Sequence, residues 1–109
     1  MIRIVEYEEE NGNHPFSNWV SNLNTQAKLK IRTSISRIEH GNFSNVKAVG
    51  RGVSEYKVDF GPGYRIYFGK DGDKLVILLA GGTKKRQSRD IEAAQVYWKD
   101  YKRRKRKER

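Results

Sequence analysis

The chain has 109 residues, enough for one compact domain, and its 23 Lys or Arg against 13 Asp or Glu give a net charge of +10. It has no Cys, which excludes disulfides, thiolate metal sites and a Cys nucleophile. The longest apolar run, Leu75 to Ala80, is six residues, whereas a membrane span needs about 20. We therefore expect a cytoplasmic protein that does not contact membranes and whose basic surface meets a polyanion, most commonly nucleic acid.

The positive charge is concentrated at the C-terminal end of the chain. Residues 1–10 hold one Arg and four Glu, whereas residues 99–109 hold eight basic and two acidic side chains. We expect a single domain over residues 1–101, followed by a frayed or disordered basic tail over residues 102–109. Such a tail either contacts nucleic acid or is solvated charge without a specific role.

A short strand over residues 2–4 and then two amphipathic helices are predicted near the N-terminus. Pro15 suits the first turn of the first helix, and its apolar stripe follows at i, i+3, i+4 and i+7: Phe16, Trp19, Val20 and Leu23. Asn24 or Thr25 is a suitable cap for the second helix, which Gly41 ends. The stripe of this second helix is Ala27, Ile31, Ile35 and Ile38. The two segments predict a helical hairpin.

Beyond the hairpin the apolar period changes to two, which indicates strands. Residues 46–68 contain three such segments, and the last two are separated by Gly-Pro-Gly. A three-residue loop there pairs Val58 with Ile66 and keeps one face of the strand pair apolar. The polar face then pairs Asp59 with Arg65.

The Asp-Gly pair at residues 71–72 is a strong signal for a two-residue hairpin loop. Such a loop pairs Phe68 with Leu75 at the start of a strand that is apolar on both faces, as a central strand is. In this register Val76 and Leu78 lie on the more polar face of the sheet, where we expect them to be exposed.

The final helix is predicted to begin near Gln87 or Ser88. Its apolar stripe at helical spacing is Ile91, Ala94, Trp98 and Tyr101. The elements then follow the order β-α-α-β-β-β-β-α. This order predicts an α+β fold with a mainly antiparallel sheet, an N-terminal helical hairpin and a C-terminal helix.

Cationic and phenolic side chains gather on the predicted polar face of the sheet. They are Lys57, Arg65 and Tyr67, with the basic loop Lys84, Lys85 and Arg86 just beyond the last strand. Arg65 is either held by Asp59 or Glu55 in a cross-strand salt bridge or serves a ligand. The convergence of these groups predicts a phosphate-binding cleft.

The sequence contains no familiar catalytic or metal-binding set. His14 and His40 lie at predicted helix ends, outside the sheet, and are expected at the surface. Asp71 and Asp73 flank a turn but supply fewer oxygen ligands than a hard cation usually needs. We therefore expect neither a metal nor a cofactor.

If the predicted cleft cuts RNA, its side chains have defined roles. The attacking 2′-OH must lose a proton, for which Lys57 or Glu55 is the candidate general base, and Lys84 or Asp90 is the candidate general acid. Cations at the phosphate stabilise the charge that develops in the transition state. Tyr67 is a candidate for stacking on an unpaired base.

A specific combination of segments carries a family resemblance. It consists of FSNWVSNL, GNFSNVKAVGRGVSEYKVDFGPGYRIYF, LLAGGTKKRQSRDI and the YWKDY helix. This combination resembles the RelE/HigB superfamily of type II toxins, and within it the "addiction module killer protein" group. The resemblance implies a RelE-like sheet carrying a two-helix hairpin. It also implies an endoribonuclease that cuts messenger RNA on the ribosome by 2′-OH attack, without metal, and thereby stops translation and growth.

The resemblance also implies roles for individual residues. Arg65, in the GYR motif, takes the place of a phosphate and transition-state stabiliser. Lys57 and Lys84 take the places of two further catalytic cations, whereas Asp59 stands where RelE has a second lysine. Near the position of the catalytic Tyr of RelE this group has Gln87 and Asp90, and the catalytic histidines of HigB have no counterpart. The expected RNA-binding set is Tyr67, Lys85, Arg86, Gln87, Lys102, Arg103 and Arg104.

Toxins of this superfamily are held inactive by an antitoxin, and in this group it usually resembles a helix-turn-helix DNA-binding protein. A toxin–antitoxin hetero-oligomer is therefore expected, with the acidic segment Glu6–Glu10 and the exposed Val76 and Leu78 as candidate contacts. The other expected partners are messenger RNA and the ribosome. Two alternatives stay open: a ParE-like, gyrase-poisoning toxin, and a non-enzymatic RNA- or ribosome-binding module favoured by the basic tail.

Overall fold

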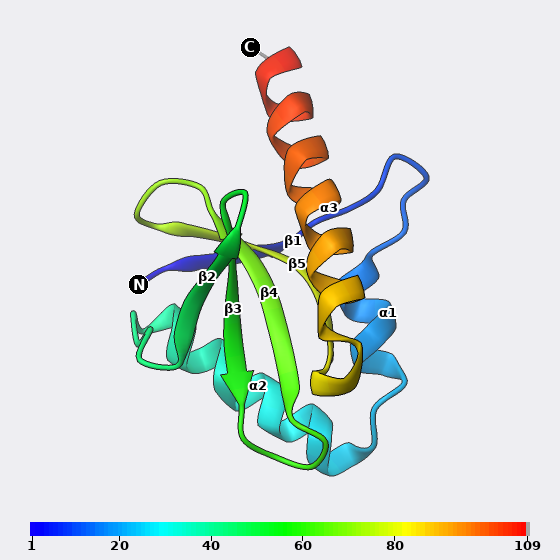
Figure 1. Ribbon diagram of the computed structural model, residues 1–109. Coiled ribbons are helices and arrows are strands. Elements are labelled where there is room, and N and C mark those ends of the chain that lie inside the picture. Colours follow the sequence, from blue (N-terminus) through cyan, green and yellow to red (C-terminus); the bar gives the residue numbers. More distant parts are fainter. Residues whose placement is uncertain (109) are drawn as a thin grey trace.

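The computed structural model describes residues 1–108, which form three helices and five strands (Figure 1). The strands are β1 (Arg3–Glu6), β2 (Val46–Gly50), β3 (Val53–Val58), β4 (Tyr64–Lys70) and β5 (Leu75–Thr83). The helices are α1 (Pro15–Ser21), α2 (Thr25–Glu39) and α3 (Gln87–Lys107), and a 3-10 turn, η1 (Lys84–Arg86), leads into α3. The predicted order of elements is confirmed.

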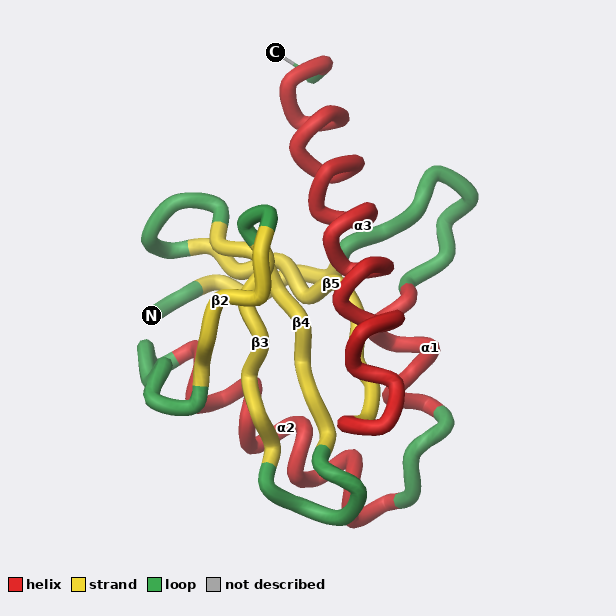
Figure 2. Tube along the Cα trace, in the orientation of Figure 1, coloured by secondary structure: helices red, strands yellow, loops and turns green. Residues whose placement is uncertain are grey.

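The five strands form one mixed sheet in the order β1-β5-β4-β3-β2. Strands β2 to β5 are joined by short connections and run antiparallel, whereas β1 pairs with β5 in parallel. The parallel pair exists because the chain crosses one face of the sheet through α1 and α2 before it returns to β2 (Figure 2). The predicted α+β class is therefore confirmed, with one parallel pair in a mainly antiparallel sheet.

Helices cover both faces of the sheet, so the protein has two apolar layers. On one face α1 and α2 bury Phe16, Ala27, Ile31 and Ile38 against the sheet. On the other face α3 buries Ala94 and Trp98. Asn24 caps α2 as predicted, because its side chain accepts a hydrogen bond of 2.8 Å from the amide of Ala27.

The two predicted hairpin registers are both wrong. Strands β3 and β4 pair Val58 with Tyr64 and Tyr56 with Ile66, which is a shift of two residues that leaves every side chain on its predicted face. Strands β4 and β5 pair Phe68 with Leu78, three residues from the prediction, with a bulge between Tyr67 and Phe68. The Asp-Gly pair does not form a two-residue loop, because the connection runs from Lys70 to Val76, which pair with one another.

Because the register of β5 against β4 differs from the prediction by an odd number of residues, each β5 side chain lies on the face opposite to the predicted one. Val76 and Leu78 face α1 and α2 and are 0% and 3% exposed, whereas Ile77 and Leu79 face α3. The prediction that Val76 and Leu78 are exposed contact points is therefore wrong. Because β5 is apolar on both faces, its sequence does not show which face turns to which helix layer.

The C-terminal basic residues continue α3 to Lys107, so the predicted frayed tail is wrong for residues 102–107. The last helical turns project beyond the sheet, at the end of the molecule opposite η1 (Figure 1). Residue 109, the last of the predicted tail, lies outside the described residues. Within residues 1–108, no helix has the length and apolar character that crossing a membrane requires.

Candidate functional site

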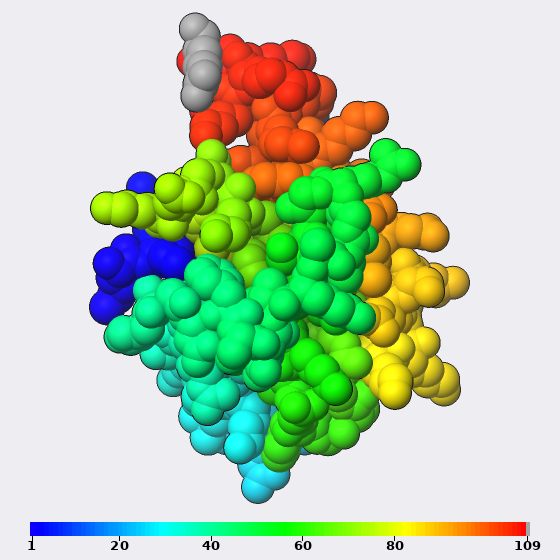
Figure 3. Space-filling view, turned by 60° about the vertical axis from the view of Figure 1, so that its left-hand side comes forward, coloured from blue at the N-terminus to red at the C-terminus, as the bar shows by residue number. Residues whose placement is uncertain are grey.

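Strand register brings the predicted site residues together in two neighbouring rows. One row crosses β2, β3, β4 and β5 as Lys47, Glu55, Tyr67 and Ala80. The other row crosses β3, β4 and β5 as Lys57, Arg65 and Gly82. Because α3 begins directly after β5 and η1, its first turns lie over both rows. In the space-filling view the β2–β3 hairpin (green) stands beside α3 (yellow to orange) (Figure 3).

Glu55 and Arg65 form a buried ion pair at the centre of these rows. The Nε of Arg65 is 3.6 Å from the Oε1 of Glu55. Arg65 is 5% exposed and Glu55 is 2% exposed. Arg65 also donates a hydrogen bond of 2.9 Å to the carbonyl of Gly63. Of the two carboxylates that the sequence offered as partners, Glu55 therefore holds Arg65. Asp59 instead pairs at the surface with Lys57, with 3.5 Å between Nζ and Oδ1.

The Glu55 carboxylate has two further partners from different elements. Gln87, the first residue of α3, donates its side-chain amide to Oε1, and the Nζ of Lys47 lies 3.9 Å from Oε2. Gln87 thus fastens the start of α3 to the sheet. Sequence reasoning missed Lys47, whose only signal is its place on the alternate face of a strand.

Tyr67 is fully buried beneath α3, so it has no face on which a base could stack, and that prediction is wrong for this conformation. Burial raises the pKa of its hydroxyl far above the ordinary value, and the negative charges of Glu55 and Asp90 add to the effect. The Tyr67 hydroxyl and the Nε of Arg65 are the two buried side-chain polar atoms of residues 1–108 that lack a hydrogen-bond partner.

Asp90, in the first turn of α3, lies directly over Gly82 of β5. A methyl group at Gly82 would overlap the Asp90 carboxylate, so the close approach of α3 requires glycine there. Burial raises the pKa of Asp90, although the positive charges of Arg86 and Arg89 oppose the shift. A raised pKa favours the protonated form that a general acid needs.

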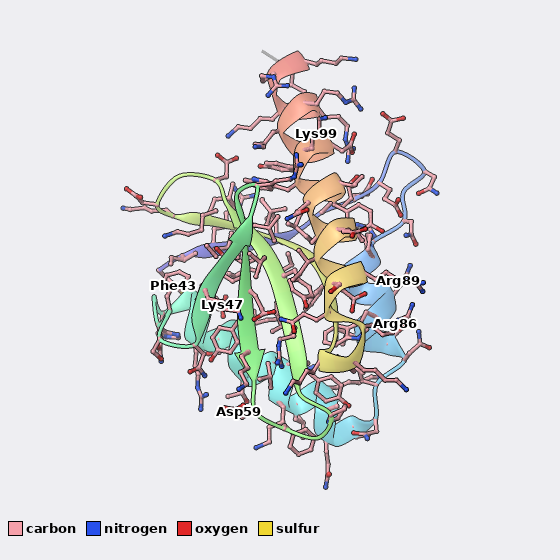
Figure 4. The ribbon with its side chains drawn as sticks, viewed as in Figure 1. Phe43, Lys47, Asp59, Arg86, Arg89 and Lys99 are labelled. Atoms are coloured by element: carbon pink, nitrogen blue, oxygen red, sulfur yellow. The ribbon has the colours of Figure 1, made fainter. Side chains whose placement is uncertain are left out.

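The exposed cations flank the start of α3 on two sides. Around η1 a surface hollow of about 410 Å³ is lined by Lys84, Lys85, Arg86, Gln87, Ser88 and Arg89. In Figure 4, Arg86 and Arg89 lie on the side of α3 away from β2, whereas Lys47 lies by β2 and β3. Lys57 is also exposed at the end of β3. The prediction of one open cationic face is therefore wrong, because α3 divides that face.

The C-terminal candidates lie apart from this cluster and are largely engaged in the fold. Arg103 pairs with Asp100 at 2.7 Å and with Glu10 at 3.1 Å, and Arg104 pairs with Asp100 at 2.9 Å. The ammonium group of Lys102 lies over the ring of Trp98. Part of the acidic N-terminal segment is thereby occupied by α3.

Metal-ligand geometry does not occur in the part of the chain that the structure describes, where no three His, Asp or Glu side chains are placed to hold a metal ion.

None of the known protein-family models matches the chain. A protein of Haemophilus influenzae, described as uncharacterized, is 44% identical over 82 residues, which cover 74% of this chain and 83% of the relative. The chain belongs to the same family as this H. influenzae protein. That family is defined here by the shared sequence alone, because the relative's description assigns no activity.

Proposed function

We propose that the protein is a RelE-like toxin of a type II toxin–antitoxin system, and that it cuts messenger RNA on the ribosome. The observation that carries the proposal is the buried group of Glu55, Arg65 and Tyr67, in which the Arg65 Nε and the Tyr67 hydroxyl make no hydrogen bond. An unsatisfied buried polar atom costs about 1–3 kcal/mol, and few occur in native proteins. Such a group supports a role in chemistry, because packing alone would favour apolar residues there.

The proposed reaction uses only side chains of this chain. Glu55 or Lys57 accepts the proton of the ribose 2′-OH, whose oxygen then attacks phosphorus and forms a 2′,3′-cyclic phosphate. The bond from phosphorus to the 5′-oxygen breaks, and Lys84 or Asp90 supplies the proton that this oxygen takes. Arg65 and Lys84 stabilise the charge on the phosphate oxygens. This scheme needs neither a metal nor a cofactor.

Substrate access in this scheme depends on the start of α3. Arg65 and Glu55 are buried, whereas Lys57 and Lys84 are exposed on either side of them. For the phosphate to reach Arg65, Gln87 must release Glu55 and the first turn of α3 must move. We therefore propose that RNA first meets the exposed lysines and then displaces the Gln87 side chain from Glu55.

The other elements of the proposal concern partners and location. A cytoplasmic toxin of this kind is held by an antitoxin, which we propose to be a helix-turn-helix protein. Because Val76 and Leu78 are buried, the remaining candidate contact for it is the acidic segment at residues 6–10. The cations Lys85, Arg86 and Lys102 are proposed to meet RNA through its phosphates.

A second candidate, a non-enzymatic RNA-binding module, is favoured by one observation. Arg65 and Glu55 satisfy much of each other's charge under α3, as a purely structural ion pair would. In that case the exposed cations bind RNA, and nothing reaches the buried group.

Mapping messenger RNA ends in cells separates the two candidates. Wild-type protein and the variant Lys57→Ala/Lys84→Ala are induced, with Lys28→Ala/Arg32→Ala as a control that removes the same charge from exposed positions on α2. The proposal predicts new RNA ends and growth arrest with wild type and control, and the loss of both with the double variant. Growth arrest without new RNA ends would contradict cleavage and favour the binding module.

A further inference from the structure

A second, smaller hollow lies on the α2 side of the sheet, where the C-terminal half of α2 passes the end of β3. Its volume is about 210 Å³, and the residues that line it include Lys30, Thr33, Arg37, Asn45, Tyr56 and Lys57. In Figure 4 the label of Asp59, which also lines it, marks the place beside α2 at the end of β3. Of these residues the proposed reaction uses only Lys57, and only Tyr56 belongs to the core.

The charge of this hollow is positive and mostly unpaired. Lys30, Arg37 and Lys57 supply three cations, and Asp59 supplies the one carboxylate. Asp59 is 3.5 Å from Lys57, whereas no ion pair joins Lys30 or Arg37 to a carboxylate anywhere in residues 1–108. The ammonium group of Lys30 lies 5.4 Å from the centroid of the Phe60 ring, which keeps it at this end of the sheet.

Neutral donors without protein partners line the same hollow. Tyr56 is only 2% exposed, yet its hydroxyl makes no hydrogen bond within the described chain. The side chains of Thr33 and Asn45 also make none there. The Tyr56 hydroxyl is not among the buried atoms without a partner, so it is open to the hollow and free to donate to an anionic ligand there.

We propose that this hollow binds a backbone phosphate of the RNA strand that the protein acts on. This inference rests on the proposed function, because the RNA is the same one. Lys57 links the two places: it lines the hollow and pairs across the strands with Arg65. A phosphate held by Lys30, Arg37 and the Tyr56 hydroxyl places the next stretch of the strand at Lys57, beside the buried group.

A phosphodiester suits this hollow better than a protein carboxylate. A phosphate presents several acceptor oxygens in different directions, and the donors come from separate elements: α2, β3 and the connection before β2. Recognition through phosphates carries no base preference, so the hollow would position any RNA sequence. In the proposed reaction the hollow therefore fixes the position of the RNA along the site, and the hollow takes no part in proton transfer.

Two variants test the proposal against a control of equal charge. Lys30→Ala/Arg37→Ala removes the two free cations, and Tyr56→Phe removes only the hydroxyl. Lys28→Ala/Arg32→Ala removes two cations from exposed positions on the same helix that do not line the hollow. The affinity of each purified protein for an end-labelled single-stranded RNA is measured by fluorescence anisotropy as a function of salt, together with its unfolding midpoint.

We expect only the variants of residues that line the hollow to lose affinity for RNA. Each of the two test variants weakens RNA binding about tenfold, as expected for a hydrogen bond or ion pair to a charged group. The slope of log affinity against log salt falls by about 0.7 for each phosphate that the double variant no longer neutralises. The control changes affinity less than about twofold, and Tyr56→Phe keeps the unfolding midpoint because its hydroxyl has no partner in the fold.

Several outcomes would overturn the proposal. They are an equal loss in the control, unchanged binding in both test variants, or no RNA binding by the wild type. If inorganic phosphate protects the wild type from unfolding but RNA binding ignores the substitutions, the hollow takes free phosphate only, and the proposal also fails. Weakened RNA binding in the test variants without any RNA cleavage would keep the phosphate site and reject the endonuclease. Normal RNA cleavage together with unchanged RNA binding in the test variants would keep the endonuclease and reject the phosphate site.

Discussion

At the scale of single residues, Arg65 and Glu55 form an ion pair that lies buried beneath the start of α3. The pairing of Arg65 with Glu55 could be predicted as one of two alternatives, because strand alternation puts both residues on one face. Their burial could not be predicted, because it depends on where α3 comes to lie after the glycines of β5. The prediction of an exposed stacking ring at Tyr67 is wrong for the same reason.

The buried pair makes a prediction about stability. Glu55→Ala leaves the Arg65 guanidinium buried without its carboxylate, so we expect the free energy of unfolding to fall by about 3–5 kcal/mol. Asp59→Ala breaks an exposed ion pair at the end of the same strand and should cost less than about 1 kcal/mol. Urea denaturation of both variants checks this, and equal losses would show that burial of the pair is not what matters.

Gly82 makes a second prediction at this scale. Gly82→Ala forces its new methyl group into the Asp90 carboxylate, and overpacking of this kind typically costs about 1–3 kcal/mol. Adding Asp90→Ala removes the obstacle, so the double variant Gly82→Ala/Asp90→Ala should regain part of the lost stability. Thermal unfolding of the wild type, the two single variants and the double variant measures these changes in stability. Additive losses in the double variant would contradict the close approach of α3 to β5.

At the scale of elements, the local patterns predicted where helices form better than where they dock. Pro15 and the Asn24 cap each mark a helix start through chemistry within a few residues. The ordered end of α3 depends instead on residues far away in the chain. Asp71 accepts from Tyr101 at 2.7 Å, and Glu10 pairs with Arg103.

The C-terminal half of α3 makes a prediction about pH. Asp100 accepts from the Tyr7 hydroxyl at 2.6 Å and pairs with Arg103 and Arg104, and these interactions hold its pKa below the ordinary value of 3.8. A lowered folded-state pKa adds stability that is complete above the ordinary pKa and is lost as pH falls through the folded value. Asp100→Asn should therefore lose about 1 kcal/mol at pH 7 and little at low pH.

Denaturant unfolding between pH 7 and pH 2 measures this dependence, and amide hydrogen exchange in the last turns of α3 locates it. Glu92→Gln, an exposed change on the same helix that breaks no ion pair within residues 1–108, serves as the control. A pH dependence in Asp100→Asn identical to that of the wild type would show that another group carries the effect.

At the scale of the whole molecule, the composition predicts a small basic domain. The positions of the charges say more about where a polyanion could bind than the net charge does. The excess at the C-terminus is partly neutralised by the acidic N-terminal segment, which α3 contacts along its last turns. The free cations instead surround the start of α3 and the hollow beside α2. The sandwiching of the sheet between two helix layers could not be predicted, because α3 resembles a surface helix in sequence and β5 is apolar on both faces.

The central claim is that the protein cuts RNA by attack of a 2′-OH, and translating ribosomes test it most directly. Purified protein is added to ribosomes carrying a defined messenger RNA, and the ends of the products are analysed by mass spectrometry. The same messenger with one 2′-deoxynucleotide at the mapped cut serves as the matched substrate. The account predicts a 2′,3′-cyclic phosphate from the first messenger and no cut at the substituted position in the second. Cleavage that persists at the deoxynucleotide, or intact messenger in both, would contradict it.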